Sequence, residues 1–222
     1  DAPFGGFPID PEDNFEDRQT DRIMAFDVVL PFDTAVPDRF NSDAVGGYTG
    51  NSNDVTRTRR VALFEGMDEY GRLQPLLGVA EPTVDAAGNT VNGAIAWHSP
   101  TTENPGLGDT EIWEVYNATE DAHPVHLHLV NFEVLNRQDF EADKIQQSVL
   151  QHNGAVGIGF RLENIHLVAG TEQDAAGVEK APKDMVTAYP EQVTRIKATF
   201  DKPGRYVWHC HILSHEDHEM MR

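Results

Sequence analysis

The sequence predicts an all-β protein, a Greek-key β-sandwich with long loops and a short C-terminal helix. Short runs of β-branched and aromatic residues recur along the chain, with the partial alternation of apolar and polar residues that is typical of strands. Gly and Pro separate these runs, as in Asp201-Lys202-Pro203-Gly204, which we expect to connect two strands. At 222 residues the chain is long enough for one well-buried domain with linkers.

The strands are predicted where high β-propensity meets turn residues at both ends. In chain order these runs are Arg22 to Leu30, Thr58 to Glu65, Glu111 to Asn117, His126 to Asn136, Glu191 to Phe200 and Gly204 to His211. This many short strands favour a sandwich of two sheets. A short helix or helical loop is predicted over Ile212 to Met221.

Two segments are less regular. Pro31 to Arg57 is polar and glycine-rich, and Arg137 to Pro190 is too long for a structureless connection in a compact domain. Inside the second segment, Ile145 and Val149 stand four residues apart, so Glu141 to Leu150 is predicted to be a helix.

The chain is strongly acidic, with 17 basic and 37 acidic residues and a formal net charge of −20. This balance argues against nucleic acid or an anionic membrane as a partner, because both carry negative charge. We interpret it as a solvated acidic surface. No run reads as a membrane span or signal peptide, and the single cysteine, Cys210, allows no disulfide within the chain.

The carboxy-terminal segment concentrates potential metal ligands. Within twelve residues it carries His209, Cys210, His211, His215 and Met220. A thiolate, imidazoles and a weak thioether together describe a blue-copper site, in which Cys and two His form a plane and Met lies at a long axial distance. One imidazole of that plane must come from elsewhere in the chain.

A second histidine segment, HPVHLH at 123–128, supplies more imidazoles than one mononuclear site needs. Surplus ligands indicate more than one metal ion. Because successive side chains of a strand point to opposite faces, Cys210 should face away from its two histidine neighbours. His126 and His128 should likewise share one face, whereas His123, separated from them by Pro124, can turn toward a different centre.

The sequence therefore predicts two metal centres that share one strand. The mononuclear site is predicted to take one thiolate, two imidazoles and one thioether, from Cys210, His123, His215 and Met220. A cluster is predicted to take four imidazoles, from His126, His128, His209 and His211. Single peptide links join the thiolate residue to two of the cluster ligands, which gives electrons a short through-bond path.

These two motifs, HPVHLH and HCHILSHEDHEMM, resemble the carboxy-terminal copper-binding segments of multicopper oxidases, the family of laccases, bilirubin oxidase and the bacterial spore-coat laccase. The resemblance extends from about Thr56 to Arg222 and implies a cupredoxin fold. It implies that type 1 copper is held by His123, Cys210, His215 and Met220. It also implies that a type 2 ligand is His126 and that the type 3 ligands are His128, His209 and His211.

The resemblance further implies a laccase-like activity. A phenolic, pigment or metal-ion donor would give one electron at a time to type 1 copper, and electrons would pass through Cys210 to a trinuclear copper cluster that reduces dioxygen to water. Glu216 matches a position where spore-coat-type laccases carry an acidic residue implicated in proton transfer. A solvated carboxylate or an acceptor for a metal ligand is the alternative interpretation. The family also implies an extracytoplasmic location.

The chain departs from the family in holding only half of the cluster ligands. A complete cluster takes as many histidines again from a first domain, and no other His-x-His segment occurs here. The remaining histidines are interpreted as surface or hydrogen-bonding residues, namely His98, His152, His166 and His218. We therefore expect residues 1–20 to be a linker from a preceding domain and residues 21–222 to be the third, C-terminal cupredoxin domain. A polypeptide carrying the N-terminal domains, as a nicked chain or a separate subunit, would complete the enzyme.

Three alternatives remain. A structural zinc site uses Cys and His but has no use for Met or for ligands in two clusters. A simple electron-transfer cupredoxin needs only the mononuclear set. A copper nitrite reductase also joins a Cys to an adjacent His ligand, but it does not need His on both sides of the cysteine, so His209 argues against it.

Overall fold

The computed structural model describes residues 27, 29, 31, 35 and 50–222. The strands within this part are β1 (Arg57–Met67), β2 (Leu73–Val84), β3 (Thr90–Ile95), β4 (Thr110–Asn117), β5 (His123–Leu127), β6 (Phe132–Leu150), β7 (Val156–Leu167), β8 (Gln173–Asp174), β9 (Met185–Ala188), β10 (Gln192–Thr199) and β11 (Trp208–Cys210). The helices are single turns, the 3-10 helix η2 (Gly177–Lys180) and α1 (Leu213–Glu216). The predicted all-β fold with a short C-terminal helix is confirmed.

The predicted linker over residues 1–20 lies outside the described residues, as do most of the predicted strand Arg22 to Leu30 and most of Pro31 to Arg57. Among the described residues, no helix is long and apolar enough to cross a membrane.

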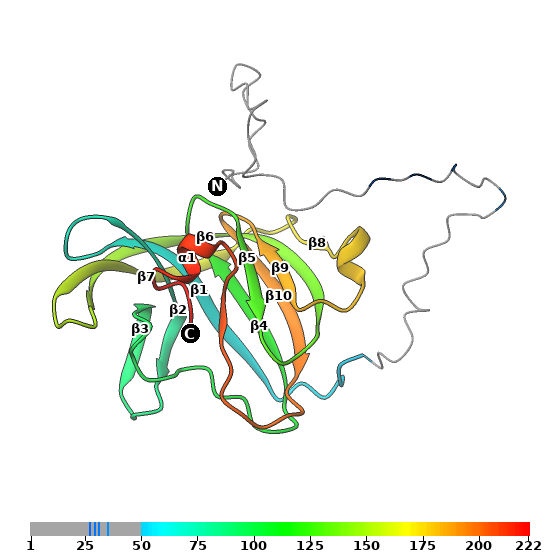
Figure 1. Cartoon of the computed structure of the whole chain (residues 1–222), viewed down its shortest axis with the longest axis horizontal. Helices are drawn as coiled ribbons and strands as arrows, with labels where there is room; N and C mark the ends of the chain where they lie inside the picture. The colour runs from blue at the N-terminus through cyan, green and yellow to red at the C-terminus, as the bar shows by residue number, and fades with distance from the viewer. Residues whose placement is uncertain (1–26, 28, 30, 32–34, 36–49) are drawn as a thin grey trace, which may run out of the picture.

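The strands form two sheets (Figure 1). The larger has the order β3-β2-β1-β4-β10-β6-β7, with β8 paired to β6, and the smaller has the order β11-β5-β9. Neighbouring strands are antiparallel, with the exception that β1 and β4 run parallel. The small sheet joins segments that lie far apart in the sequence, and it carries both histidine segments.

A core of buried apolar side chains fills the space between the two sheets. The large sheet contributes Leu63, Trp113 and Ile196, and the small sheet contributes Val125 and Trp208. A second core lies on the other face of the large sheet and includes side chains from β1, β2, β3, β4, β6, β7 and β10. Because β1 has a core on both faces, its central run of apolar residues is buried without alternation.

A buried ion pair joins β1 to β4 beside the first core. Arg59 donates to both carboxylate oxygens of Glu111, at 2.8 Å from Nε and 2.7 Å from Nη2. Trp113 Nε1 donates to the same carboxylate at 2.9 Å. Because the guanidinium and the carboxylate are both buried, removing either partner would leave an uncompensated charge, at a cost of about 3–5 kcal/mol.

The predicted helix over Glu141 to Leu150 is wrong. These residues form the second half of β6, paired antiparallel with β7 through residues such as Ile145 and Val149. A spacing of four fits a strand as well as a helix, because it is a multiple of the two-residue strand period. Pairing with β7 decides the outcome, and burial here alternates from residue to residue.

Two predicted strands are shorter than expected. The run from His126 to Asn136 is interrupted between β5 and β6, where Leu129 has a φ of 78°. That left-handed conformation is incompatible with a continuous strand. In the run from Gly204 to His211, only Trp208–Cys210 is a strand. As a result, His128 lies just after β5 and His211 just after β11.

Candidate metal centre

Pairing of β5 with β11 places the two histidine segments side by side. The strands are antiparallel, with His126 opposite His209. Opposite residues of such a pair lie on the same face of the sheet, so these two imidazoles face one way and Cys210, the next residue, faces the other. His123 lies three positions before His126 and therefore faces the side of Cys210. Strand alternation, rather than a turn at Pro124, directs it there.

Three predicted ligands of the mononuclear site come together at one end of the core. Cys210 Sγ lies 3.5 Å from His123 Nδ1 and 4.0 Å from His215 Nδ1, and the two nitrogens are 3.4 Å apart. With metal bonds of ~2.0–2.1 Å to nitrogen and ~2.3 Å to sulfur, as in zinc sites, a trigonal plane would separate the nitrogens by ~3.5 Å and each from sulfur by ~3.8 Å. The observed triangle fits one metal ion at its centre.

The register of the C-terminal segment distinguishes Met220 from Met221. Cys210 N donates to Met220 O at 3.0 Å, and Met221 is paired with His209. Met220 therefore lies opposite the cysteine and shares its face, where its side chain is fully buried. Met221 lies on the histidine side and is partly exposed. This geometry supports Met220 as the thioether of the mononuclear site.

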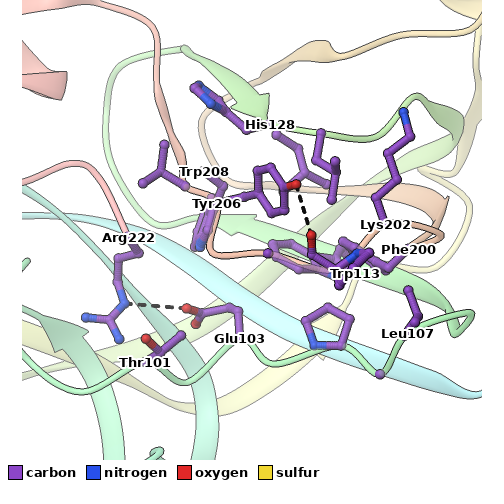
Figure 2. Close-up of a pocket in the computed structure, with 17 residues that line it drawn as sticks. Thr101, Glu103, Leu107, Trp113, His128, Phe200, Lys202, Tyr206, Trp208 and Arg222 are labelled. Atoms are coloured by element: carbon purple, nitrogen blue, oxygen red, sulfur yellow. Dashed lines mark hydrogen bonds and ion pairs between the residues drawn. The ribbon is translucent and has the colours of Figure 1, made fainter.

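Arg222 anchors the segment that carries Met220. Its backbone exchanges hydrogen bonds of 2.8 and 2.9 Å with Trp208. Its guanidinium donates to Ala96 O at 3.1 Å and Pro100 O at 2.8 Å, and it forms an ion pair with Glu103 at 3.5 Å (Figure 2). The segment is thus fixed at β11 and at the loop after β3.

The four histidines of the predicted cluster share the other face. Their ring centroids lie between 4.7 and 5.8 Å apart in the contacts among His126, His128, His209 and His211. Nε2 of His128 and Nε2 of His209 lie 3.1 Å apart. His128 and His211 are exposed, so this set of ligands lies at the surface of the described chain.

Backbone carbonyls select the nitrogen that two of these histidines present. His126 Nδ1 lies 2.8 Å from Asp184 O, and His209 Nδ1 lies 3.0 Å from Cys210 O. A carbonyl only accepts, so each Nδ1 is the protonated donor and each Nε2 keeps its lone pair. The cluster face therefore offers Nε2 from these two residues, whereas the mononuclear site offers Nδ1.

Burial shifts the protonation of the mononuclear ligands. It lowers the pKa of His123 to about 3, with a smaller contribution from His215, so this imidazole is neutral near pH 7. Burial also raises the pKa of the Cys210 thiol to about 11. A metal cation that binds here must displace the thiol proton, which gives metal uptake a pH dependence.

Glu216 lies between the cluster histidines and solvent. Its Oε2 is 3.2 Å from His209 Nδ1, and its side chain is 26% exposed. It also lines a hollow of about 510 Å³ together with Asp217, Glu219 and Trp97. The carboxylate therefore touches a predicted ligand on one side and an acidic, open hollow on the other.

The scattered histidines belong to neither group of ligand atoms. His98 and His152 are exposed and contact each other edge to face, with centroids 5.5 Å apart. His166 is exposed and His218 is partly exposed. Their interpretation as surface residues agrees with this placement.

Polar residues that the sequence did not point to lie behind His123. Thr119 Oγ1 lies 2.7 Å from His123 Nε2 and 2.8 Å from Asn117 Oδ1, and all three residues are buried. Glu65 Oε1 lies 3.9 Å from the same Nε2. An Asn and a Thr after a strand are common turn residues, so composition alone gave no sign that they contact a ligand.

A small aromatic pocket borders His128. Figure 2 shows four of the residues that line this pocket, Trp113, Phe200, Tyr206 and Trp208. Tyr206 donates its hydroxyl hydrogen to Pro203 O at 3.2 Å, which closes one side. The cavity measures about 150 Å³. That is below the ~300 Å³ at which pockets for small molecules usually begin.

A sequence profile described as multicopper oxidase matches residues 72–222. A laccase of Bacillus subtilis (strain 168) is 38% identical over 169 residues, which cover 76% of this chain and 27% of that protein. A laccase of Bacillus stratosphericus is 41% identical over 127 residues, which cover 57% of this chain and 22% of that protein. A solved multicopper oxidase from Campylobacter jejuni, described as a metallo-oxidase, aligns with a TM-score of 0.47 and 19% identity over 79% of this chain and 31% of that chain.

The chain spans about a quarter of the length of these laccases. The matching profile includes both histidine segments. Copper is the cofactor that the match implies, and a thiolate with two converging imidazoles and a thioether fits this metal. The resemblance inferred from the motifs is confirmed: the chain belongs to the multicopper oxidase family.

Proposed function

We propose that this chain is the C-terminal part of a laccase-like oxidase that oxidises a donor at a mononuclear copper site and reduces dioxygen at a cluster. One observation carries the proposal. Cys210 lies between His209 and His211, with its sulfur beside His123 and His215 and its two neighbours on the opposite face. Such an arrangement links two metal centres through one strand.

Bound copper would supply the one-electron oxidation of the donor and the four-electron reduction of dioxygen to water. The protein would hold the ligands, bury the mononuclear site and link the centres. Cys210 is joined to His209 and His211 through single peptide units, so the covalent path between the thiolate and either imidazole is short. Trp208 and the buried core beside it exclude water from the cysteine side.

The second centre would be completed by another polypeptide segment. Four histidines reach its face, and two of them are exposed at the surface of the described chain. We propose that N-terminal cupredoxin domains, in a nicked chain or a separate subunit, supply the remaining imidazoles and cover this face. Residues 1–20 would then be the linker from those domains, and residues 21–222 the third domain.

For the electron donor we propose a chemical class rather than one compound. The two Bacillus relatives are named laccases, which supports a phenolic donor, and pigments or metal ions are further members of the class. An extracytoplasmic location is proposed from the family alone.

Glu216 is proposed to serve proton transfer to the cluster. Dioxygen reduction consumes protons, and this carboxylate lies 3.2 Å from His209 Nδ1 while it lines the acidic hollow. Its second possible role is to accept a hydrogen bond from that imidazole and so orient it. The two roles respond differently to substitution, as described below.

A gas-consumption assay tests the proposed function. The enzyme that contains this chain and the complementary histidines should consume dioxygen with a phenolic donor and show a near-ultraviolet band from coupled copper ions. Cys210→Ser should lose the blue charge-transfer band and turnover while the fold is retained, because this cysteine supplies the thiolate. Nitrite consumption without dioxygen consumption would instead identify a nitrite reductase, and a blue Cys210→Ser protein would contradict the mononuclear site.

A further inference from the structure

A chain of buried polar groups connects the end of β4 to His123. Asn117, Thr119 and His123 are exposed by 0%, 2% and 0%, so their polar atoms depend on one another rather than on solvent. Buried polar groups of this kind are costly unless every donor and acceptor is paired.

The orientation of the Asn117 side chain is fixed by three backbone contacts. Its Nδ2 donates to Asp121 O at 2.8 Å and to Ala188 O at 3.0 Å. Its Oδ1 accepts from Thr119 N at 3.0 Å. A flipped amide would bring its oxygen against two carbonyls and its NH₂ group against a backbone N–H, so Oδ1 must face Thr119.

The contacts of the Thr119 hydroxyl then determine where its single hydrogen points. Oγ1 lies 2.8 Å from Asn117 Oδ1 and 3.0 Å from Asp121 O, and both of these oxygens can only accept. Two oxygens this close repel each other unless a hydrogen lies between them, so the hydroxyl hydrogen is donated to one of these two oxygens and not to the imidazole. Toward the third neighbour, His123 Nε2 at 2.7 Å, Oγ1 offers a lone pair.

It follows that His123 Nε2 carries the hydrogen and donates it to Thr119. In a neutral imidazole the other nitrogen, Nδ1, then holds a lone pair. This Nδ1 is the atom that lies 3.5 Å from Cys210 Sγ and 3.4 Å from His215 Nδ1. The lone pair thus points to the place where the metal ion is proposed to bind.

We propose that Asn117 and Thr119 are positioning residues that fix the tautomer and ring orientation of His123 before the metal ion arrives. The proposal rests on the mononuclear site proposed above. Asn117 holds the hydroxyl, the hydroxyl holds Nε2–H, and Nδ1 is left free for the metal. At His126 and His209 a backbone carbonyl takes the place of the hydroxyl and accepts from Nδ1–H, so that Nε2 is left free. The ligands of the two centres are therefore preset to different nitrogens by different partners.

Nitrogen NMR of the metal-free protein tests the tautomer without any variant. The signals of His123 should show hydrogen on Nε2 and a bare Nδ1. Hydrogen on Nδ1 would overturn the proposal. This measurement is independent of copper, so it stands even if the protein proves to bind another metal or to lack oxidase activity.

Substitutions at Thr119 test the consequence for metal binding. Thr119→Val keeps the shape and removes the acceptor, so copper affinity at the mononuclear site should fall by ~10- to 100-fold, as for other residues that orient metal ligands. Thr119→Ser keeps the hydroxyl and should retain the affinity. Thr194→Val is the matched control, because Thr194 is fully buried on β10 and its Oγ1 has no hydrogen-bond partner.

Copper affinity is measured by competition with a chelator, and the blue band reports occupancy of the mononuclear site. Reduced affinity in Thr119→Val alone supports the positioning role. Equal affinity in Thr119→Val and the unmodified protein overturns it. Absence of a blue band in every protein, the unmodified one included, would contradict the proposed mononuclear copper site instead, and the NMR result would then decide the tautomer.

Discussion

At the scale of single residues, the two proposed centres differ in which ring nitrogen each histidine presents. His123 and His215 turn Nδ1 toward the cysteine sulfur, and the Nδ1 atoms of His126 and His209 are held by backbone carbonyls. Because successive side chains of a strand point to opposite faces, one segment can supply ligands to both proposed centres. The position of a histidine on its strand thus sets which centre it faces. Its hydrogen-bond partner sets which ring nitrogen it presents.

Met220 and Met221 should respond differently to substitution. Met220 shares the face of Cys210, whereas Met221 is paired with His209. Since a weak axial ligand tunes the reduction potential, Met220→Leu should raise the potential of the mononuclear site and keep its blue colour. Met221→Leu, the matched control, should leave the potential unchanged. Redox titration of the blue band measures both, and the opposite pattern would mean that the register is wrong by one residue.

Glu216 can be tested by a substitution that keeps its shape. Glu216→Gln removes the ionisable group but keeps an oxygen that can lie beside His209 Nδ1. If the carboxylate transfers protons, turnover should fall by ~10²-fold and its pH profile should change. Asp217→Asn, in the same hollow, is the control and should have little effect. Unchanged turnover and an unchanged pH profile in Glu216→Gln would leave only the orienting role.

At the scale of elements, a buried carboxylate ties three strands of the large sheet together. Glu114 on β4 accepts from Arg60 on β1 at 2.9 Å and from Arg195 on β10 at 2.8 Å. Burial alone would raise the pKa of Glu114, but the hydrogen bonds from Arg195 and Arg60 outweigh it and lower the pKa. The ionised carboxylate therefore stabilises the folded state.

The stability from Glu114 should depend on pH. A lowered folded-state pKa means that this stability is present above the unfolded value of 4.5 and is lost as the pH falls through the folded value. Glu114→Gln should lower the free energy of unfolding by about 1–3 kcal/mol at pH 7, and the difference should shrink in acid. Glu163→Gln, whose ion pair with Arg161 is largely exposed, is the control. Chemical denaturation at several pH values would contradict this if the loss were equal at pH 7 and pH 3.

The sequence could predict which of the candidate ligands share a face, because that depends on local alternation. Cys210 and its histidine neighbours occupy successive positions, so their separation to two faces needs no tertiary information. The choice between Met220 and Met221 was different. It depends on how the C-terminal segment pairs with β11, which the motif match suggested and the backbone hydrogen bonds support.

Other features could not be read from the sequence because long-range pairing decides them. Residues 141–150 have a spacing that fits a helix or a strand, and β7 selects the strand. Thr119 and His123 are only four residues apart in the sequence. Which of them donates the hydrogen bond depends on Asn117, whose side-chain orientation is fixed by Ala188 on β9. No pattern in the sequence indicates that Ala188 contacts Asn117.

At the scale of the whole molecule, the proposed mononuclear site has a full set of candidate ligands among the described residues, whereas the proposed cluster does not. The first is enclosed by the core and by the segment that Arg222 anchors. The second is a set of imidazoles at the surface of the described chain, and metal ions of like charge will not stay together there without further ligands. The account therefore requires a second polypeptide for catalysis and not for the blue site.

Copper content and oxygen uptake of this chain, purified without any other polypeptide, test that requirement most directly. The monomeric chain should bind about one copper ion per molecule, from its one complete ligand set, and turn blue. It should show no sustained dioxygen reduction with a phenolic donor until a polypeptide carrying the missing histidines is added. Sustained four-electron turnover by the chain as a monomer would contradict the account.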